Sequence, residues 1–210
     1  MNRREALQRV ALLMGGTVIG ANLFLEGCSR SASKDTAKLF EKDSVNFIGD
    51  LAEAILPKTS TPGAKEAGVG EFIPVMVRDC YADTEQKVFL DGINTVDDRA
   101  KKEFGKKFQE LSKEDQTKFV NILDKEASEY NAKQAEATKA QREKDALKQN
   151  EMYRVPKSDP PHWFTMFKQL TLTGFFTSEL GATKALRYVK IPGKFDGNYP
   201  YKKGEHAWAL

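Results

Sequence analysis

Few residues in this sequence have the type and spacing needed for catalysis or metal binding, and they are scattered. The two histidines, His162 and His206, lie far apart, and neither has a second ligand at the spacing typical of a metal site. Asp97 and Asp98 could act as an acid and a base, but charges on a helix surface explain the pair more simply. Ser178 lacks the surroundings of a nucleophile elbow. We therefore predict no catalytic, cofactor-binding or metal-binding residue in this chain.

The two cysteines could support a different chemistry. Leu25, Gly27 and Cys28 resemble a lipobox, where a bacterial cysteine receives a lipid and becomes the mature N-terminus, although Glu26 is an unusual occupant. A disulfide between Cys28 and Cys80 is the alternative in an oxidising compartment. Lipidation would leave Cys80 unpaired, and its place on an apolar helical face predicts a buried thiol. We expect lipidation of Cys28.

Residues 1–27 resemble an export signal. Arg3 and Arg4 precede an apolar stretch over residues 10–25, and Leu7 lies where a twin-arginine signal carries a leucine. The stretch is too short and too rich in glycine to predict a membrane span, which needs about 20 mainly apolar residues. An ordinary secretory signal with a chance arginine pair is the alternative. A twin-arginine signal would imply that something folds before export.

Length and composition predict one compact domain. The chain has 210 residues, of which 40% are hydrophobic, enough for one core of ordinary size. The formal net charge is +3, and the lysines are interspersed with acidic residues, which argues against a nucleic-acid partner. Residues 28–43 are polar and predict a tether. We place the folded domain at residues 44–210.

Beyond this tether the apolar residues follow a helical spacing almost throughout. Four segments carry the pattern: residues 44–56, 69–80, 89–104 and 112–130. Ser44 is the predicted cap of the first helix, a break near Asp97 is expected in the third, and Ser112 with Asp115 forms a capping signature for the fourth. Residues 59–70 are rich in turn formers and predict an ordered loop. No stretch alternates with period two, so we predict an all-α fold.

Residues 131–151 are polar on every side of any helix they could form. Their alanine, lysine and glutamate content favours helix, but such a helix has no apolar face to bury. A solvent-exposed extension of the preceding helix and a mobile excursion are both compatible with this composition. A coiled-coil site is less compatible, because no apolar heptad is present.

The last third of the chain is rich in aromatic residues. We expect Phe164, Phe167 and Leu170 to lie in the core of a helix that follows Pro161. An irregular tail then follows, in which aromatic residues alternate with proline, glycine and lysine. Such a tail suits the surface of a partner protein, whereas folding back on its own domain is the alternative. The predicted partner-facing aromatic residues are Trp163, Phe195, Tyr199, Tyr201 and Trp208.

Three stretches resemble the gluconate 2-dehydrogenase subunit 3 family. They are ILPKTSTPGAKEAGVGEFIPVMVRDCY at residues 55–81, LTLTGFFTSELG and LRYVKIPGKFDGNYP. The first contains a helix ending in proline followed by a Thr-Pro-Gly-Ala turn. The twin-arginine start is also typical of the family. The resemblance extends over residues 44–210, apart from the polar segment at 131–151.

The resemblance implies a non-catalytic small subunit. Members of the family accompany a flavoprotein dehydrogenase of the glucose-methanol-choline type, which carries FAD and oxidises a sugar or sugar acid such as gluconate, glucose or a glycoside. A cytochrome c with haem commonly accepts the electrons. The small subunit supplies the export signal and supports maturation of its partner. We accordingly expect a periplasmic, lipid-anchored chain that binds the flavoprotein through its tail and through Thr61, Pro62 and Gly63.

Two other functions remain open from the sequence. The chain could be a stand-alone periplasmic scaffold or binding lipoprotein with the same fold. It could also be an oxidoreductase itself, which would require flavin or haem to stay with the isolated chain. The sequence contains no CxxCH motif for covalent haem.

Overall fold

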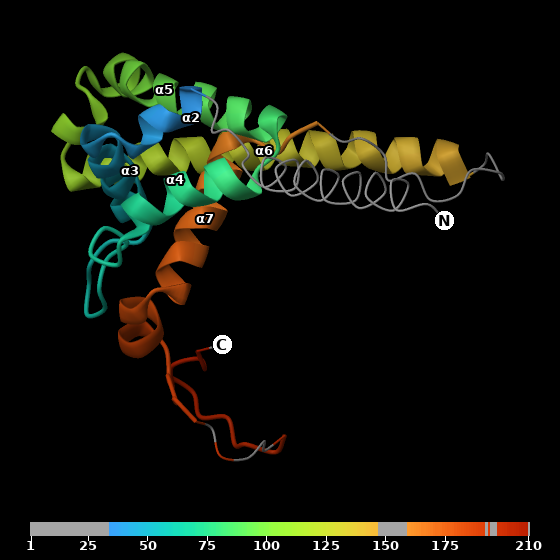
Figure 1. Ribbon diagram of the computed structural model, residues 1–210. Helices are drawn as coiled ribbons and strands as arrows, with labels where there is room; N and C mark the ends of the chain where they lie inside the picture. Colours follow the sequence, from blue (N-terminus) through green and yellow to red (C-terminus); the bar gives the residue numbers. More distant parts are fainter. Residues whose placement is uncertain (1–33, 147–158, 192, 194–196, 210) are drawn as a thin grey trace, which may run out of the picture. The chain divides into compact units, whose positions relative to one another are not determined.

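The computed structural model describes residues 34–146, 159–191, 193 and 197–209, and these form helices without strands (Figure 1). The helices are α2 (Lys34–Ala37), α3 (Lys42–Ile55), α4 (Val69–Cys80), α5 (Asp83–Phe104), α6 (Lys113–Ala146) and α7 (Trp163–Thr177). Short 3-10 turns lie at η1 (Lys38–Phe40) and η2 (Phe108–Glu110), and a π-helical turn at η3 (Gly181–Ala185). The all-α prediction is confirmed.

The predicted export and lipidation residues lie outside the described part of the chain. These residues are Arg3, Arg4, Leu7 and Cys28. Within the described residues, no helix combines the length and apolar character needed to cross a bilayer.

The helical part begins earlier than the sequence predicts. Residues 34–43, which we expected in the tether, form α2, η1 and the first two residues of α3. Leu39 anchors this segment, because its side chain is buried in the main core. The prediction that Ser44 caps the first long helix is also wrong, since α3 starts at Lys42 and Glu41 occupies the cap position. Leu39 and Phe40 are adjacent in an otherwise mostly polar stretch, so they gave no helical period that could reveal the earlier start.

Helix α5 continues through the expected break at Asp97. The carboxylate of Asp97 accepts the backbone N–H of Phe108 (3.1 Å), so the side chain fastens η2 to the helix. The helix ends instead at Gly105, whose φ of 76° is the left-handed conformation that glycine adopts readily at a helix C-terminus. The next helix starts as predicted, because Ser112 Oγ accepts the backbone N–H of Asp115 (3.2 Å).

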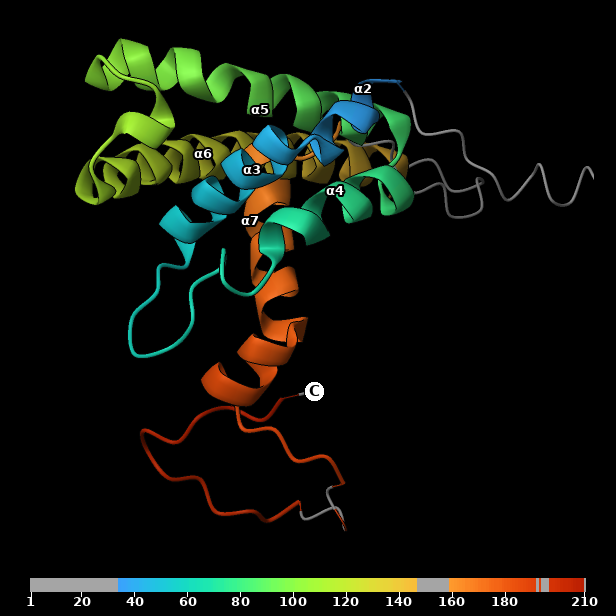
Figure 2. The same cartoon turned by 60° about the vertical axis from the view of Figure 1, so that its left-hand side comes forward.

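Helix α7 forms the centre of the core. It carries one charged residue, Lys168, and contacts α3, α4, α5 and α6. Figure 2 shows it lying between α3 and α4 and crossing α5 and α6. A helix that is apolar on nearly every side requires such surroundings. The prediction that Phe164, Phe167 and Leu170 belong to the core is confirmed.

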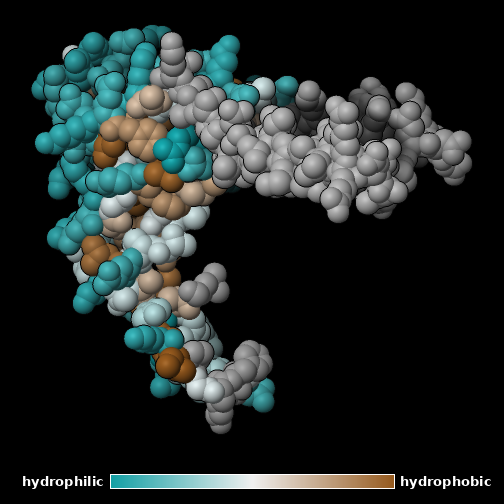
Figure 3. All heavy atoms as spheres, in the orientation of Figure 1, coloured by the Kyte–Doolittle hydropathy of each residue, from teal (hydrophilic) through white to brown (hydrophobic). Residues whose placement is uncertain are grey.

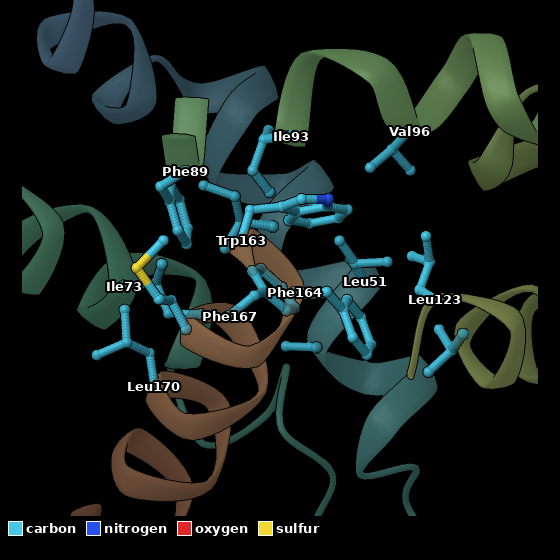
Figure 4. Packing of buried hydrophobic residues seen from close by; sticks show 14 of the residues in the cluster. Leu51, Ile73, Phe89, Ile93, Val96, Leu123, Trp163, Phe164, Phe167 and Leu170 are labelled. Carbon is cyan, nitrogen blue, oxygen red and sulfur yellow. The ribbon is translucent and has the colours of Figure 1, made fainter. Parts of the chain in front are cut away.

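Trp163 also lies in this core, which corrects its prediction as a partner-facing residue. Its side chain is only 6% exposed and packs among Phe89, Ile93 and Phe167 (Figure 4). Gly92 of α5 makes room for the indole, because a Cβ at this position would overlap the ring. Nothing near Trp163 in the sequence indicates this burial, because the residue that makes room for it is a glycine on another helix.

The polar segment after residue 130 continues α6 as helix up to Ala146, so the helical extension is confirmed as far as the structure describes it. Most residues from 132 to 140 are exposed. The base of this extension holds the start of α7: Asn131 Nδ2 donates to Thr165 Oγ1 (2.7 Å), and Tyr130 Oη donates to the carbonyl of Pro160 (3.3 Å).

Candidate partner-binding surface

The side chains considered for catalysis hold local structure together. His162 is the N-cap of α7, and its Nδ1 accepts the backbone N–H of Phe164 (3.3 Å). Partial burial lowers the pKa of His162 below its usual 6.5, which favours the neutral ring that this cap requires. Ser178 Oγ donates to the carbonyl of Phe175 (2.7 Å) and accepts the N–H of Gly181 (3.0 Å). These contacts give each group a role in a helix end.

The remaining candidates are also separate from one another. His206 Nδ1 lies 2.7 Å from the carbonyl oxygen of Ala185, and Asp98 is an exposed residue near Lys101 (3.9 Å). Among the described residues, no group of three or more His, Cys, Asp or Glu side chains could hold a metal ion.

Cys80 is exposed, so the predicted buried thiol is wrong. It lies in the last turn of α4, with its sulfur 4.0 Å from that of Met76. The helical spacing placed Cys80 on the apolar row of α4, but Val77 is the last buried residue of this helix, and its final two residues are exposed. The described residues do not include Cys28 and so leave the choice between lipid and disulfide open.

The loop between α3 and α4 is organised by a single carboxylate. Glu53 Oε1 accepts the backbone N–H of Lys58 (2.8 Å), and Oε2 accepts that of Lys65 (2.9 Å). The backbone N–H of Ala64 donates to the carbonyl of Leu56 (2.9 Å), which closes the loop at its base. This network confirms the predicted ordered loop. A charged acceptor with two N–H donors is among the stronger arrangements of hydrogen bonds.

Only part of the predicted turn faces solvent. Gly63 is buried against the carboxylate of Glu53, and a Cβ there would overlap it, so Gly63 supports the loop from within. Thr61 and Pro62 are half-buried, and Thr61 accepts the backbone N–H of Thr59 through its carbonyl (3.0 Å). The exposed parts of the loop are residues 57–60 and residues 65–66.

Arg187 joins the two ends of the C-terminal tail. Its backbone N–H donates to the carbonyl of Ala207 (2.8 Å), and its carbonyl accepts the N–H of Ala209 (3.0 Å). Its guanidinium carbon lies 4.5 Å from the ring centroid of Trp208, and the same group contacts Glu205 (3.1 Å) and the hydroxyl of Tyr199 (3.0 Å). The rings of Tyr199 and Trp208 meet edge to face, with centroids 5.5 Å apart. One arginine thus holds together described residues that lie about twenty positions apart along the chain.

The predicted tail aromatics lie outside the core. Tyr201 is 85% exposed, and Tyr199 and Trp208 are about half exposed. None of the three belongs to the buried core, although the tail does contact Ala185 and Arg187, at and just after the end of the last helical turn. Phe195 lies outside the described residues. In Figure 3 the surface over α5 is mostly hydrophilic, whereas apolar side chains appear along α7 and again in the tail.

Sequence reasoning located the loop and the tail but missed the residues that shape them. Glu53 lies within a helix just before the first of the family-like stretches, and Arg187 lies within the last of them, but neither residue type indicates a shaping role there. Both act through partners between 5 and 21 positions away along the chain. The exposed Tyr188 and Ile191 were also missed, although their neighbours Pro192 and Gly193 indicate that no regular element buries them.

A family model described as gluconate 2-dehydrogenase subunit 3 matches residues 42–193. The match covers the helices from α3 to α7 and the first part of the tail, and Tyr199, Tyr201 and Trp208 lie beyond it. No curated protein and no solved structure matches the chain.

Proposed function

Because this chain belongs to the gluconate 2-dehydrogenase subunit 3 family, and is thus a small subunit of a dehydrogenase complex, we propose that it is non-catalytic and binds a flavoprotein catalytic subunit. The family match over most of the chain carries this proposal. The local roles of His162, Asp97 and Ser178 in helix caps and turns support it, because these side chains are already engaged in holding the fold.

The proposed catalytic partner is an FAD-dependent dehydrogenase of the glucose-methanol-choline type. It would take two electrons from a sugar or sugar acid. It would then pass these electrons to an acceptor such as the haem of a cytochrome c subunit. Gluconate, glucose and glycosides oxidised at the third carbon are the substrate classes that fit the family. In this arrangement the present chain contributes protein contacts to the complex and no cofactor of its own.

The chain is also proposed to direct the complex out of the cytoplasm. The twin-arginine system transports folded proteins, so one signal can serve two chains if they assemble first. Arg3, Arg4 and Leu7 supply that signal, and Cys28 then anchors the complex in the periplasm. A bacterial lipoprotein carries more than one acyl chain, which makes its attachment durable.

The export proposal is tested by replacing Arg3→Lys and Arg4→Lys together in the full chain in its own host. This change keeps the charge and removes the guanidinium pair. Fractionation should then find both the chain and the flavoprotein in the cytoplasm. Arg9→Lys is the matched control and should leave export normal. Normal delivery of the flavoprotein to the periplasm by the double variant would contradict the proposal.

A further inference from the structure

We propose that the C-terminal tail is a preformed arm that docks on an acidic, partly apolar surface of the catalytic subunit. The docking surface, called the tail face below, is defined by the exposed apolar side chains Tyr188, Val189, Ile191, Tyr199, Tyr201 and Trp208. This inference rests on the proposed function, because it takes the flavoprotein as the occupant. It goes further by assigning the contact to the tail, whose second half, with Tyr199, Tyr201 and Trp208, lies beyond the family match.

The first observation is the concentration of exposed apolar side chains in the tail. Among the described residues, ten large apolar side chains are exposed, and six of them form the tail face. Ile191 is 78% exposed and Tyr201 is 85% exposed. Large apolar groups gathered on one segment indicate a protein-binding surface, whereas scattered single ones need no explanation. Tyrosine and tryptophan are enriched at such interfaces.

The second observation is that the tail is held in shape by Arg187 rather than by a core. The guanidinium group lies over Trp208, contacts Glu205 and donates to Tyr199 Oη, while the backbone of Arg187 bridges Ala207 and Ala209. His206 adds a contact to the carbonyl of Ala185 (2.7 Å). A flexible segment loses conformational entropy when it binds, and a segment that is already closed loses less. Arg187 is therefore a positioning residue for the arm.

The third observation is charge. From residue 187 to residue 209 the sequence has five basic and two acidic residues, a net charge of +3. Arg187 and Glu205 lie 3.1 Å apart and largely compensate each other. Three lysines close in sequence to the apolar residues are exposed: Lys190, Lys202 and Lys203. The Nζ of Lys202 lies 3.8 Å from a carboxylate oxygen of Glu205, which is a long ion pair. Exposed lysines that neighbour exposed apolar residues along the chain fit a partner surface that carries acidic groups as well as apolar pockets.

A protein partner fits this arm better than a lipid surface does. A segment that lies in a membrane interface is typically an amphipathic helix with one apolar face. The described tail residues instead form an irregular segment, in which an isolated β-bridge pairs the backbones of Arg187 and Trp208. The rings of Tyr199 and Trp208 contact each other and the guanidinium group of Arg187, an arrangement that suits complementary pockets on a folded protein.

The test uses the full chain, tagged and purified from its own host with its companion. The immobilised complex is washed, and release of the flavoprotein is followed by FAD fluorescence. Arg187→Ala, Tyr201→Ala and the pair Lys202→Glu with Lys203→Glu should each release it at least about tenfold faster, because interface substitutions act mainly on dissociation. The pair Lys133→Glu with Lys139→Glu makes the same charge change on exposed positions of α6 and should release it at the wild-type rate.

Salt and folding controls complete the experiment. Wild-type release should be faster at about 500 mM than at about 50 mM NaCl, and the Lys202/Lys203 pair should lose much of this difference, because salt screens exposed charges. Circular dichroism and thermal unfolding should be unchanged for Tyr201→Ala, whose side chain is outside the core.

The outcomes separate this inference from the proposed function. If the wild-type chain carries no flavoprotein, both are overturned. If it carries one and the three tail variants release it at the wild-type rate, only the docking arm is overturned. The arm is also overturned if light scattering shows that tail variants abolish self-association, or if they reduce binding to vesicles of anionic phospholipid while keeping the flavoprotein.

Discussion

Gly92 of α5 lies directly against the indole of Trp163 of α7, so that a methyl group on this glycine would overlap the ring. This contact joins two helices at the centre of the core, where Phe89 and Phe167 also meet with centroids 6.2 Å apart. It explains why Trp163 is unavailable to a partner although the sequence around it suggested otherwise.

Gly92→Ala should destabilise the protein. The added methyl group has to displace the indole in a close-packed interior, and overpacking of this kind costs about 1–3 kcal/mol. Thermal or denaturant unfolding of the purified chain measures the change. Asn94→Ala, at an exposed position of the same helix, is the control and should cost less than about 0.5 kcal/mol. Equal stability of the two variants would show that the contact is not tightly packed.

Glu53→Ala should loosen the loop between α3 and α4. In this variant the backbone N–H groups of Lys58 and Lys65 lose their charged acceptor. A hydrogen bond to a charged group contributes about 1.5–3 kcal/mol where it is sheltered from water, and it contributes less in this half-exposed loop. Hydrogen exchange should show faster exchange at the amides of Lys58 and Lys65. Glu66→Ala removes only the exposed pair with Lys58, and it should leave both amides protected. If the amides of Lys58 and Lys65 exchange at the wild-type rate in Glu53→Ala, the carboxylate of Glu53 does not organise the loop.

His162 should make stability depend on pH. Burial lowers its pKa in the folded chain below 6.5, with Arg99 adding to the effect and Glu126 opposing it. The unfolded chain therefore binds more protons in this range, and the free energy of unfolding should fall as the pH drops from about 6.5 towards the folded pKa. The loss is complete below the folded pKa, where both states are protonated.

The matched variant for this pH effect is His162→Asn. Asparagine is a good N-cap but does not titrate, so α7 should keep its cap while the stability change between about pH 7 and about pH 5 becomes smaller. Denaturant unfolding at several pH values measures it. An identical pH profile in wild type and variant would assign the dependence to other groups.

Cys28→Ser should release the chain from the membrane fraction if Cys28 is lipidated as proposed. Cys80→Ser should leave membrane attachment unchanged, because Cys80 serves only the alternative disulfide. Fractionation of the host and electrophoresis without reducing agent distinguish the two chemistries. A mobility change shared by both variants on the non-reducing gel, with membrane attachment unaffected, would favour the disulfide.

The helical elements were predictable because their information is local. Period, caps and breakers within one segment fixed α3, α4 and the start of α6 to within a few residues, and Ser112 with Asp115 is the clearest case. The errors have non-local causes. Asp97 stays inside α5 because its carboxylate binds the N–H of Phe108, and Leu39 orders the N-terminal turns because the core accepts it.

The candidate surface was predictable only in outline. Aromatic residues among proline, glycine and lysine identified the tail, and turn formers identified the loop. Arg187 and Glu53 give these segments their shape. Both contact residues several positions away along the chain, and no local sequence pattern indicates such contacts. Trp163 was assigned to the surface by residue type and Gly63 as part of the family-like turn, although contacts with Gly92 and Glu53 bury them.

The most direct test of the account is whether this chain holds a flavoprotein that performs the catalysis. The tagged chain is purified from its own host, and the absorbance of FAD, the companion protein and sugar-dependent dye reduction are measured before and after the two chains are separated. We predict a yellow companion whose flavin is reduced by a sugar or sugar acid, with no flavin and no activity left on the separated chain. A chain that purifies without any flavoprotein, or that keeps flavin and activity by itself, would contradict the account.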